Sequence, residues 1–368
     1  MKMNASLFRH LAVVTALLLP AATQPSFAQT TATTDPVGFI TVSIAGNGTV
    51  ASPKNSFVSP TLTQPTLWQG LIDPASNGSV STNTTGGTTI TVNGQQWTNG
   101  QFGATGSYYV EIVTGSTNTH ASGAVSDIAA STTATVGSVT TSSITTADNL
   151  TGLAAAGDNI RIRRHVTLSD LFGANNSAGL QASTSISSAD EVLVYNGSAF
   201  AKYWYYDGTL GGTAGWVDLN FNDSSTAIIG PNEGVVVKRK ATGALTFTFQ
   251  GAVKTANTLI PIRNGINVLG TVSAKGLTLD TSGLVNGSSG LTASSSISTA
   301  DEVTIYTGSS PTKYWYYDGS LGGAAGWVDL NFNPAGTASI APGSAFIVKR
   351  KANASLNFNW PLPSPSSF

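Results

Sequence analysis

The chain has 368 residues, with 17 lysines and arginines against 18 aspartates and glutamates, and it contains no cysteine. A net charge of -1 provides no basic field for phosphates, so nucleic-acid binding is not expected. The lack of cysteine excludes disulfide scaffolds, thiolate zinc sites and cysteine nucleophiles. With 40% hydrophobic residues, the chain has enough apolar surface to bury a core, which argues against a disordered polymer.

The N-terminal end has the order of a secretory signal peptide. Lys2 and Arg9 precede the apolar run 11–19, and Ser26-Phe27-Ala28 places small residues at a cleavage point. The run is too short for a permanent membrane helix, so no span is expected in the mature chain. The sequence therefore predicts a signal peptide over 1–28, cleaved near Ala28, and export to the periplasm, the cell surface or the medium.

The next segment, predicted as an N-terminal domain over 29–160, is rich in Thr and Gly. It contains hairpin material at 86–94 and strand-like runs at 108–113 and 159–163. Short runs of β-branched and aromatic residues between glycine-containing turns are typical of antiparallel strands. The helical pattern is confined to 167–173, where Thr167 is expected to cap a turn that Gly173 ends.

The rest of the chain is an internal duplication with an offset of 111 residues. Lys202-Tyr-Trp-Tyr-Tyr-Asp-Gly208 recurs from Lys313, and Gly215-Trp-Val-Asp-Leu-Asn-Phe-Asn222 recurs from Gly326. The predicted units are 161–254 and 255–361, followed by a Pro/Ser-rich tail over 362–368. Each unit has the size of a small β domain. We therefore expect an all-β protein of antiparallel sandwich-like or barrel-like units, with either two domains or one pseudo-symmetric body in the duplicated part.

The duplicated aromatic segments are the candidate ligand-binding residues. Alternation on a strand places Tyr203 and Tyr205 on one face and Trp204 on the other, and Trp216 lies on a following strand. Two alternatives stay open at this point. The rings build the core, or one face is exposed and stacks on sugar rings. The full candidate set is Tyr203, Trp204, Tyr205, Trp216, Tyr314, Trp315, Tyr316 and Trp327.

Asp218, Asn220 and Asn222 are the candidate metal ligands. If the segment is a strand, their oxygens line one face, which suits a hard cation such as calcium. The spacing does not match an EF-hand, because Asp223 and Ile229 occupy its glycine and glutamate positions. A half-buried strand with a polar outer face explains the pattern more simply, and no cofactor is expected.

The sequence offers little for catalysis. The adjacent acids Asp190 and Glu191 point to opposite faces of a strand, so they cannot act on one bond together. His165 is isolated from other histidines, and we expect a structural or surface role for it. The basic triplet 238–240 and its copy at 349–351 are interpreted as charge at strand ends, with a patch for acidic glycans or lipids as the alternative.

Several segments resemble an exported paralogous family of β-rich proteins in verrucomicrobial bacteria. The likeness lies in Thr34-Asp-Pro-Val-Gly-Phe-Ile-Thr-Val42, in the Arg-rich segment 160–173, in Ala189-Asp-Glu-Val192 and in strands that end in Val-Lys-Arg. The family has no assigned activity. The resemblance therefore implies export and a β-rich build, and it implies no catalytic residue.

We expect a non-enzymatic exported protein with a structural, adhesive or surface-assembly role, for which self-association is an expected property. The first alternative is a carbohydrate-binding module whose aromatic strand faces contact polysaccharide or other cell-surface components. The second is a glycan-acting hydrolase with paired carboxylates.

Overall fold

The computed structural model describes residues 35–72, 79–82, 86–103, 106–113, 123–285, 290–351 and 358–362. These residues belong to one compact unit, Asp35–Phe368. The predicted signal peptide over 1–28, the tail after Leu362 and His120 lie outside the described residues.

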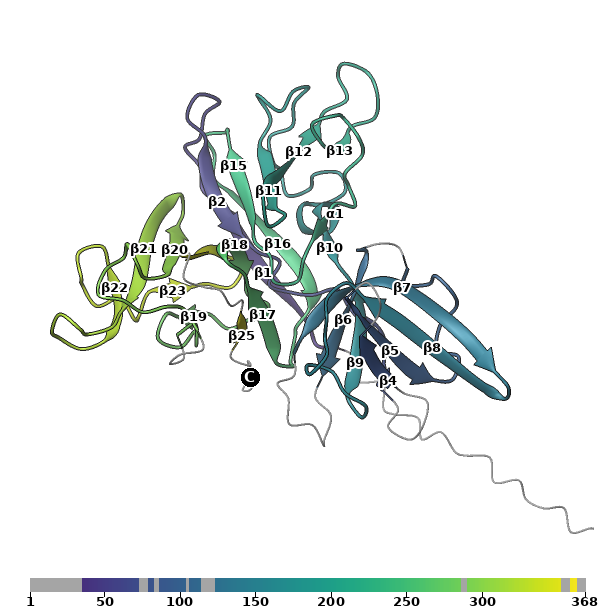
Figure 1. The fold of residues 1–368 in the computed structure, drawn as a ribbon. Helices are drawn as coiled ribbons and strands as arrows, with labels where there is room; N and C mark the ends of the chain where they lie inside the picture. The colour runs from purple at the N-terminus through teal and green to yellow at the C-terminus, as the bar shows by residue number, and fades with distance from the viewer. Residues whose placement is uncertain are drawn as a thin grey trace, which may run out of the picture. The chain divides into compact units, whose positions relative to one another are not determined.

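The described chain is built almost wholly from antiparallel strands, which confirms the predicted fold class (Figure 1). A seven-stranded sheet, here called the N-terminal sheet, has the order β3-β9-β6-β7-β8-β5-β4. Its strands are β3 (Thr66–Leu71), β4 (Ser79–Thr82), β5 (Thr88–Asn93), β6 (Tyr108–Val113), β7 (Val125–Val136), β8 (Val139–Thr146) and β9 (Asn159–Arg164).

The N-terminal sheet has a core of its own. Ile residues on β6 and β9 and the rings of Trp97 and Phe102 are buried there. Tyr108–Val113 and Asn159–Arg164 are strands as the sequence predicts. The Ser/Thr-rich residues that follow position 131 form the β7–β8 hairpin, in which hydroxyls pair across the strands, as Thr135 does with Thr140 at 2.9 Å.

A five-stranded sheet, the first repeat sheet, has the order β13-β12-β11-β15-β2. Its strands are β2 (Lys54–Val58), β11 (Glu191–Tyr195), β12 (Phe200–Tyr206), β13 (Gly215–Val217) and β15 (Val235–Arg239). The pairs β1 (Val37–Ile44) with β16 (Leu245–Ala252) and β10 (Val166–Thr167) with β14 (Ile228–Ile229) share its core.

A second five-stranded sheet, the second repeat sheet, has the order β22-β21-β20-β24-β18. Its strands are β18 (Gly265–Gly270), β20 (Glu302–Thr307), β21 (Ser310–Tyr317), β22 (Gly326–Asp329) and β24 (Ala345–Arg350). The accompanying pairs are β17 (Thr258–Ile262) with β25 (Phe358–Leu362) and β19 (Leu277–Thr278) with β23 (Ser339–Ile340). Strand order and pairing are therefore the same in the two repeat sheets.

This pairing places β1 and β2 with the first repeat sheet. The sequence-based division put both strands in an N-terminal domain ending at 160, but β1 pairs with β16 and β2 pairs with β15. They take the places that β17 and β18 take in the second set. The strands from β3 to β9 thus come between β2 and β10 in the chain. Sequence alone did not show this, because β1 and β2 share no clear motif with β17 and β18.

The one α-helix in the described part of the chain is the predicted turn. Helix α1 (Leu168–Phe172) begins after Thr167, whose hydroxyl accepts a hydrogen bond from the Asp170 N–H at 3.2 Å. The Asp170 carboxylate accepts in return from the Thr167 N–H at 2.9 Å, which completes a capping box. Gly173 ends the turn with a φ of 86°. Among the described residues, no helix is long and apolar enough to cross a membrane.

Candidate functional site

The four candidate tryptophans are core residues. Trp204, Trp216 and Trp315 are each 1% exposed, and Trp327 is 4% exposed. Phe221 packs edge-on against Trp204 at 5.3 Å, and the Trp216 Nε1–H donates to the Gly173 carbonyl at 2.9 Å. Because they are buried, these rings have no free face for a ligand. Their burial contributes to the stability of the sheets instead.

The candidate tyrosines are half-buried and pack against the same cores: Tyr203, Tyr205, Tyr314 and Tyr316. Tyr205 contacts Trp216 edge-on at 5.4 Å, and Tyr316 contacts Trp327 in the same way at 5.6 Å. Tyr203 also lines a shallow hollow beside Lys202 and Asp218. The aromatic strands thus serve mainly the interior, and their surface contribution comes from the half-buried tyrosines and from Phe200 at the start of β12.

The segment that carries Asp218, Asn220 and Asn222 is a turn, and the strand predicted there is wrong. β13 ends at Val217, and Phe221 has a φ of 60°. One Asp218 oxygen accepts from the N–H groups of Asn220 and Asn222 at 2.8 and 2.9 Å. The Asn222 side-chain amide donates to the other oxygen at 3.0 Å, and this hydrogen bond, with the backbone ones, lowers the Asp218 pKa. The carboxylate holds the turn, and no group of three or more acidic or histidine side chains suited to a metal occurs among the described residues.

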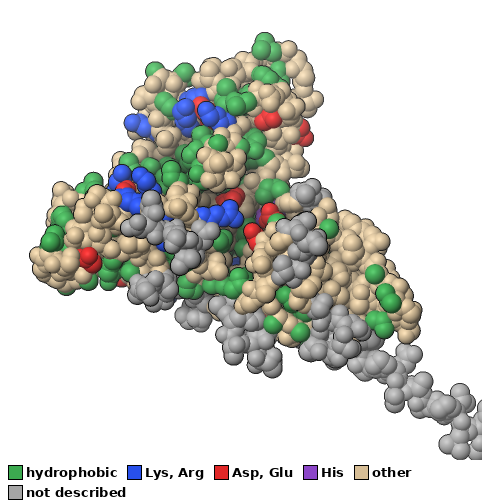
Figure 2. Space-filling view, viewed as in Figure 1, with side chains coloured by type: hydrophobic (Ala, Val, Ile, Leu, Met, Phe, Trp, Pro, Cys, Tyr) green, Lys and Arg blue, Asp and Glu red, His purple; other side chains and the backbone are tan. Residues whose placement is uncertain are grey.

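The paired acids and the basic triplets neutralise each other. Arg239 forms a buried ion pair with Asp190, and the Lys240 ammonium lies 2.7 Å from a Glu191 oxygen. Lysine hydrogen bonds lower the pKa of Glu191 against the opposing effect of burial. The second repeat has the same arrangement, in which Arg350 pairs with Asp301 and Lys351 pairs with Glu302. The face shown in Figure 2 is accordingly mostly neutral, with lysine and arginine in a few small groups, so these triplets do not form an open basic patch.

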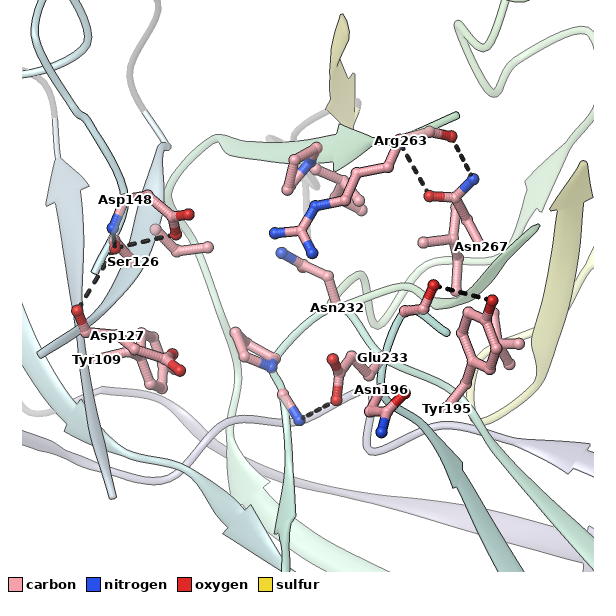
Figure 3. A pocket seen from close by; sticks show the side chains of 18 of the residues that line it. Tyr109, Ser126, Asp127, Asp148, Tyr195, Asn196, Asn232, Glu233, Arg263 and Asn267 are labelled. Carbon is pink, nitrogen blue, oxygen red and sulfur yellow. Dashed lines mark hydrogen bonds between the residues drawn. The ribbon is translucent and has the colours of Figure 1, made fainter. Parts of the chain in front are cut away.

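A polar pocket of about 580 Å³ lies where residues of the N-terminal sheet meet loops of both repeat sheets (Figure 3). Its charged and amide groups come from segments far apart in the chain. They lie in β7, after β8, between β9 and β10, in the β14–β15 turn and between β17 and β18: Asp127, Asp148, His165, Asn232, Glu233 and Arg263. In Figure 3, Asp127 and Asp148 stand on one side, and Arg263, Asn232 and Glu233 stand on the other.

His165 is paired with an acid in the wall of this pocket. Its Nε2 lies 3.0 Å from an Asp127 oxygen, and its ring packs against Tyr109 with centroids 4.8 Å apart. The Nε2–H tautomer of the ring donates to the Asp127 carboxylate and leaves Nδ1 as an acceptor. Nδ1 is buried and has no hydrogen-bond partner within the described part of the chain. The expected structural role of His165 therefore leaves one of its ring nitrogens unexplained.

The β14–β15 turn supplies the opposite wall. The Gly230 N–H donates to Glu233 at 2.9 Å, and burial raises the pKa of the Glu233 carboxyl despite this hydrogen bond and the nearby His165. The Asn232 side-chain oxygen is buried and, among described residues, lacks a donor. An acceptor buried in this way costs about 1–3 kcal/mol. The pocket thus holds two polar atoms whose hydrogen bonding the protein does not complete.

Other polar groups in the pocket are held in place by local hydrogen bonds. Ser126 donates to an Asp148 oxygen at 3.1 Å, and its own oxygen accepts from the Asp148 N–H at 2.9 Å. The Asn267 amide bonds both the N–H and the carbonyl of Arg263, at 2.9 and 2.8 Å. The Arg263 side chain is exposed and extends into the pocket (Figure 3).

The corresponding place on the other repeat is filled. Leu269 of β18 bridges to Glu233, whereas Val58 of β2 bridges to Ser344, the residue 111 positions after Glu233. Next to Val58, the Phe57 ring stacks on Tyr306 with centroids 3.7 Å apart. Val268 is the neighbour of Leu269. It lines the pocket together with Tyr195, the residue 111 positions before Tyr306. Val268 on β18 is smaller than Phe57 on β2, so the space that the Phe57 ring fills beside Tyr306 stays open beside Tyr195.

Most of these pocket residues escaped sequence reasoning, because single residues from five segments form no motif. One signal was present. Gly230-Pro-Asn-Glu-Gly234 aligns at the repeat offset with Ala341-Pro-Gly-Ser-Ala345, so Asn232 and Glu233 are polar substitutions specific to the first copy. The differences between the two copies therefore indicate the pocket, whereas the motifs that the copies share do not.

Comparison with known proteins gives no assignment: no family model, curated protein or solved structure matches the chain. The resemblance to an exported verrucomicrobial family therefore gains no support and stays a prediction.

Proposed function

We propose that this protein is an exported, non-enzymatic binding protein whose pocket holds a carbohydrate. The observation that carries the proposal is the pair of buried acceptors, His165 Nδ1 and Asn232 Oδ1, in the wall of one cavity. A ligand with many hydroxyl donors complements such a wall, because each donor it supplies replaces a hydrogen bond that the protein lacks.

The size and lining of the pocket suit a sugar. A volume of about 580 Å³ lies within the usual range for small-molecule sites, about 300–1,000 Å³. The half-buried Tyr195 ring supplies an aromatic edge, and Ile228 and Val268 supply apolar contact. We therefore propose that carbohydrate binds in the pocket between the three sheets. The aromatic strand faces are largely buried and are not proposed as the site.

The carboxyl groups in the pocket also bear on the hydrolase alternative. Hydrolysis of a glycoside needs two carboxyls on either side of the scissile bond. In this pocket, Asp127 is engaged with His165, and Asp148 is engaged with Ser126. We therefore propose binding without cleavage. Incubation with the bound oligosaccharide, followed by mass spectrometry of the products, is expected to show intact sugar.

The test is a glycan array probed with the purified protein and with a double variant, Asn232→Gly plus Glu233→Ser. This variant copies the second repeat's own residues at 343 and 344 into the first turn, which makes it compatible with the backbone. We expect the wild type to bind a defined group of saccharides and the variant to lose that binding. An array without signal, or equal binding by the variant, overturns the proposal.

A second candidate, self-assembly at a surface, is favoured by a duplicated apolar patch. Each repeat exposes two leucines and a phenylalanine in the loops on either side of β13 or β22. The exposed fractions are 79%, 57% and 55% for Leu210, Leu219 and Phe221, and 76%, 56% and 53% for Leu321, Leu330 and Phe332. Exposed apolar groups of this kind often mark interaction sites.

The backbone of this patch is strained in both copies. Phe221 and Phe332 have φ values of 60° and 61°, a region that bulky residues rarely adopt. Two like patches on one chain allow a second and a third copy to bind to one molecule, which gives an extended assembly. Leu210→Ser with Leu321→Ser is expected to abolish assembly in sedimentation, whereas Leu67→Ser, at an exposed site elsewhere, leaves it intact. A wild type that stays monomeric at high concentration rules out this candidate.

A further inference from the structure

Two buried atoms of the pocket lack a hydrogen-bond partner among the described residues, and both are acceptors when His165 donates through Nε2. His165 Nδ1, Asn232 Oδ1 and the carboxylates all accept, and the Arg263 guanidinium is the charged donor among the lining side chains. A neutral sugar hydroxyl can donate one hydrogen bond, whereas a primary ammonium group donates three. A ligand that carries an ammonium group therefore satisfies more of the wall than a neutral sugar of the same size.

The charges point in the same direction. Three acidic side chains, Asp127, Asp148 and Glu233, line the pocket, against the single positive charge of Arg263. A cation in this partly enclosed space thus meets Asp127 and Asp148, and it also meets Glu233, which burial keeps neutral until a positive charge is placed against it.

Glu233 is the acid that a cation would change most. Burial disfavours its charged form and raises its pKa, Asp127 acts in the same sense, and the Gly230 N–H, His165 and Arg263 oppose the shift. Tyr109 and Tyr195 are the other titratable side chains that line the pocket. A positively charged group placed against Glu233 offsets the cost of ionising it, so ligand binding and proton release are coupled.

We infer that the pocket selects an amino sugar, a saccharide unit with a free primary amine whose ammonium group contacts Glu233. This inference rests on the proposed function, carbohydrate binding in the same pocket, and adds the chemical class of the ligand. N-acetylation of the amine removes its charge and two of its donors and adds bulk. The preferred unit is therefore the free amine, in contrast to its acetylated or hydroxyl counterparts.

The experiment is calorimetric titration with three oligosaccharides of equal length, built from glucosamine, N-acetylglucosamine or glucose. The glucosamine oligomer is expected to bind at least about tenfold tighter than the other two. Equal affinity for all three overturns the amino-sugar inference and leaves carbohydrate binding intact. Absence of binding to these oligomers, with binding of other saccharides on the array, also overturns this inference alone. Absence of any saccharide binding overturns both proposals.

Two variants separate the role of Glu233 from general loss of negative charge. Glu233→Gln keeps the side-chain shape and the acceptor for the Gly230 N–H, and it should abolish the preference for the free amine. Asp207→Asn removes one charge from the β12–β13 loop, outside the pocket, and should keep the preference. If the two variants behave alike, the contact with Glu233 is wrong.

Proton release gives an independent readout. At a pH where the amine is fully protonated, titrations in two buffers of different ionisation enthalpy should show protons released by the wild type on binding glucosamine oligomers. Glu233→Gln should release none. Equal release from both proteins contradicts the assignment, even where affinities change.

Discussion

Phe57 and Tyr306 stack with their ring centroids 3.7 Å apart, and this pair fills the position that corresponds to the pocket in the other repeat sheet. The correspondence follows from strand order, because β2 and β18 each lie at the edge of a five-stranded sheet. The Phe57 ring closes the space beside Tyr306. The space beside Tyr195 is the pocket, and it is lined by Asn232 and Glu233, which are polar residues specific to the first copy. The pocket thus lies at a place where the two similar halves differ in sequence.

The stacked pair is expected to stabilise the fold. Phe57→Val should lower the free energy of unfolding by about 1–3 kcal/mol, because it removes the stacking of a partly buried ring on Tyr306. Phe39→Val is the matched control, since Phe39 is 72% exposed, and it should change stability by less than about 0.5 kcal/mol. Urea unfolding of both variants measures the difference. Equal effects would show that the stacked ring contributes nothing.

The buried tryptophans allow a comparison of two rings of equal burial. Trp216 Nε1 donates to the Gly173 carbonyl, whereas the buried Trp204 Nε1 has no partner in the described regions. Replacement by Phe should therefore cost about 1 kcal/mol more at Trp216 than at Trp204. Replacement by Ala should cost about 3–5 kcal/mol at either position. Denaturant midpoints test this, and a mild Trp204→Ala variant that loses sugar binding would restore the aromatic strands as the binding face.

Arg163 lies in a buried ion cluster that joins the start of the described chain to the N-terminal sheet. Its guanidinium is 2.9 Å from Asp35 and 3.2 Å from Glu111, which also pairs with Lys254. Arg163→Met removes the buried guanidinium that lies between Asp35 and Glu111, so that Glu111 keeps Lys254 and Asp35 keeps Thr66 as partners, and it should destabilise the protein by about 3–5 kcal/mol. Arg164→Met breaks the half-exposed pair with Asp170 and should cost at most about 1 kcal/mol. Thermal unfolding of the two variants should rank them in this order, and the reverse order contradicts it.

Glu233 should make stability depend on pH in a sense opposite to most acids. Its pKa is raised above the ordinary 4.5, so the fold favours the neutral form. The stability it contributes is complete below 4.5 and is lost as pH rises through the raised pKa. Glu233→Gln cannot ionise, so it should be more stable than the wild type by about 1 kcal/mol at neutral pH and equal to it in acid. Unfolding curves at the two pH values test this, and a variant less stable than the wild type at neutral pH contradicts the sign.

Local features were the most predictable from sequence. The strands at 108–113 and 159–164, the Asn196-Gly197 hairpin turn and the Thr167 cap follow from side-chain patterns and turn chemistry within a few residues. The strand predicted through Asp218 failed for a local reason. Asp218 accepts two backbone hydrogen bonds and closes a turn, and such short-range competition overrides alternation.

Long-range relations were harder to predict. Whether the aromatic rings face inward depends on which sheet covers them, and the partners of β1 and β2 lie about 200 residues away in the chain. The pocket brings together Asp127, His165 and Glu233, and none of these residues signals the others in sequence.

The most direct test of the pocket as the ligand site is calorimetric titration of Val268→Phe beside the wild type. The substitution places a ring where Phe57 stands in the corresponding position, so it should stack on Tyr195 and fill the cavity. We predict that the variant keeps the thermal stability of the wild type and loses saccharide binding by about a hundredfold or more. A folded Val268→Phe variant that binds saccharide with unchanged affinity would contradict the account.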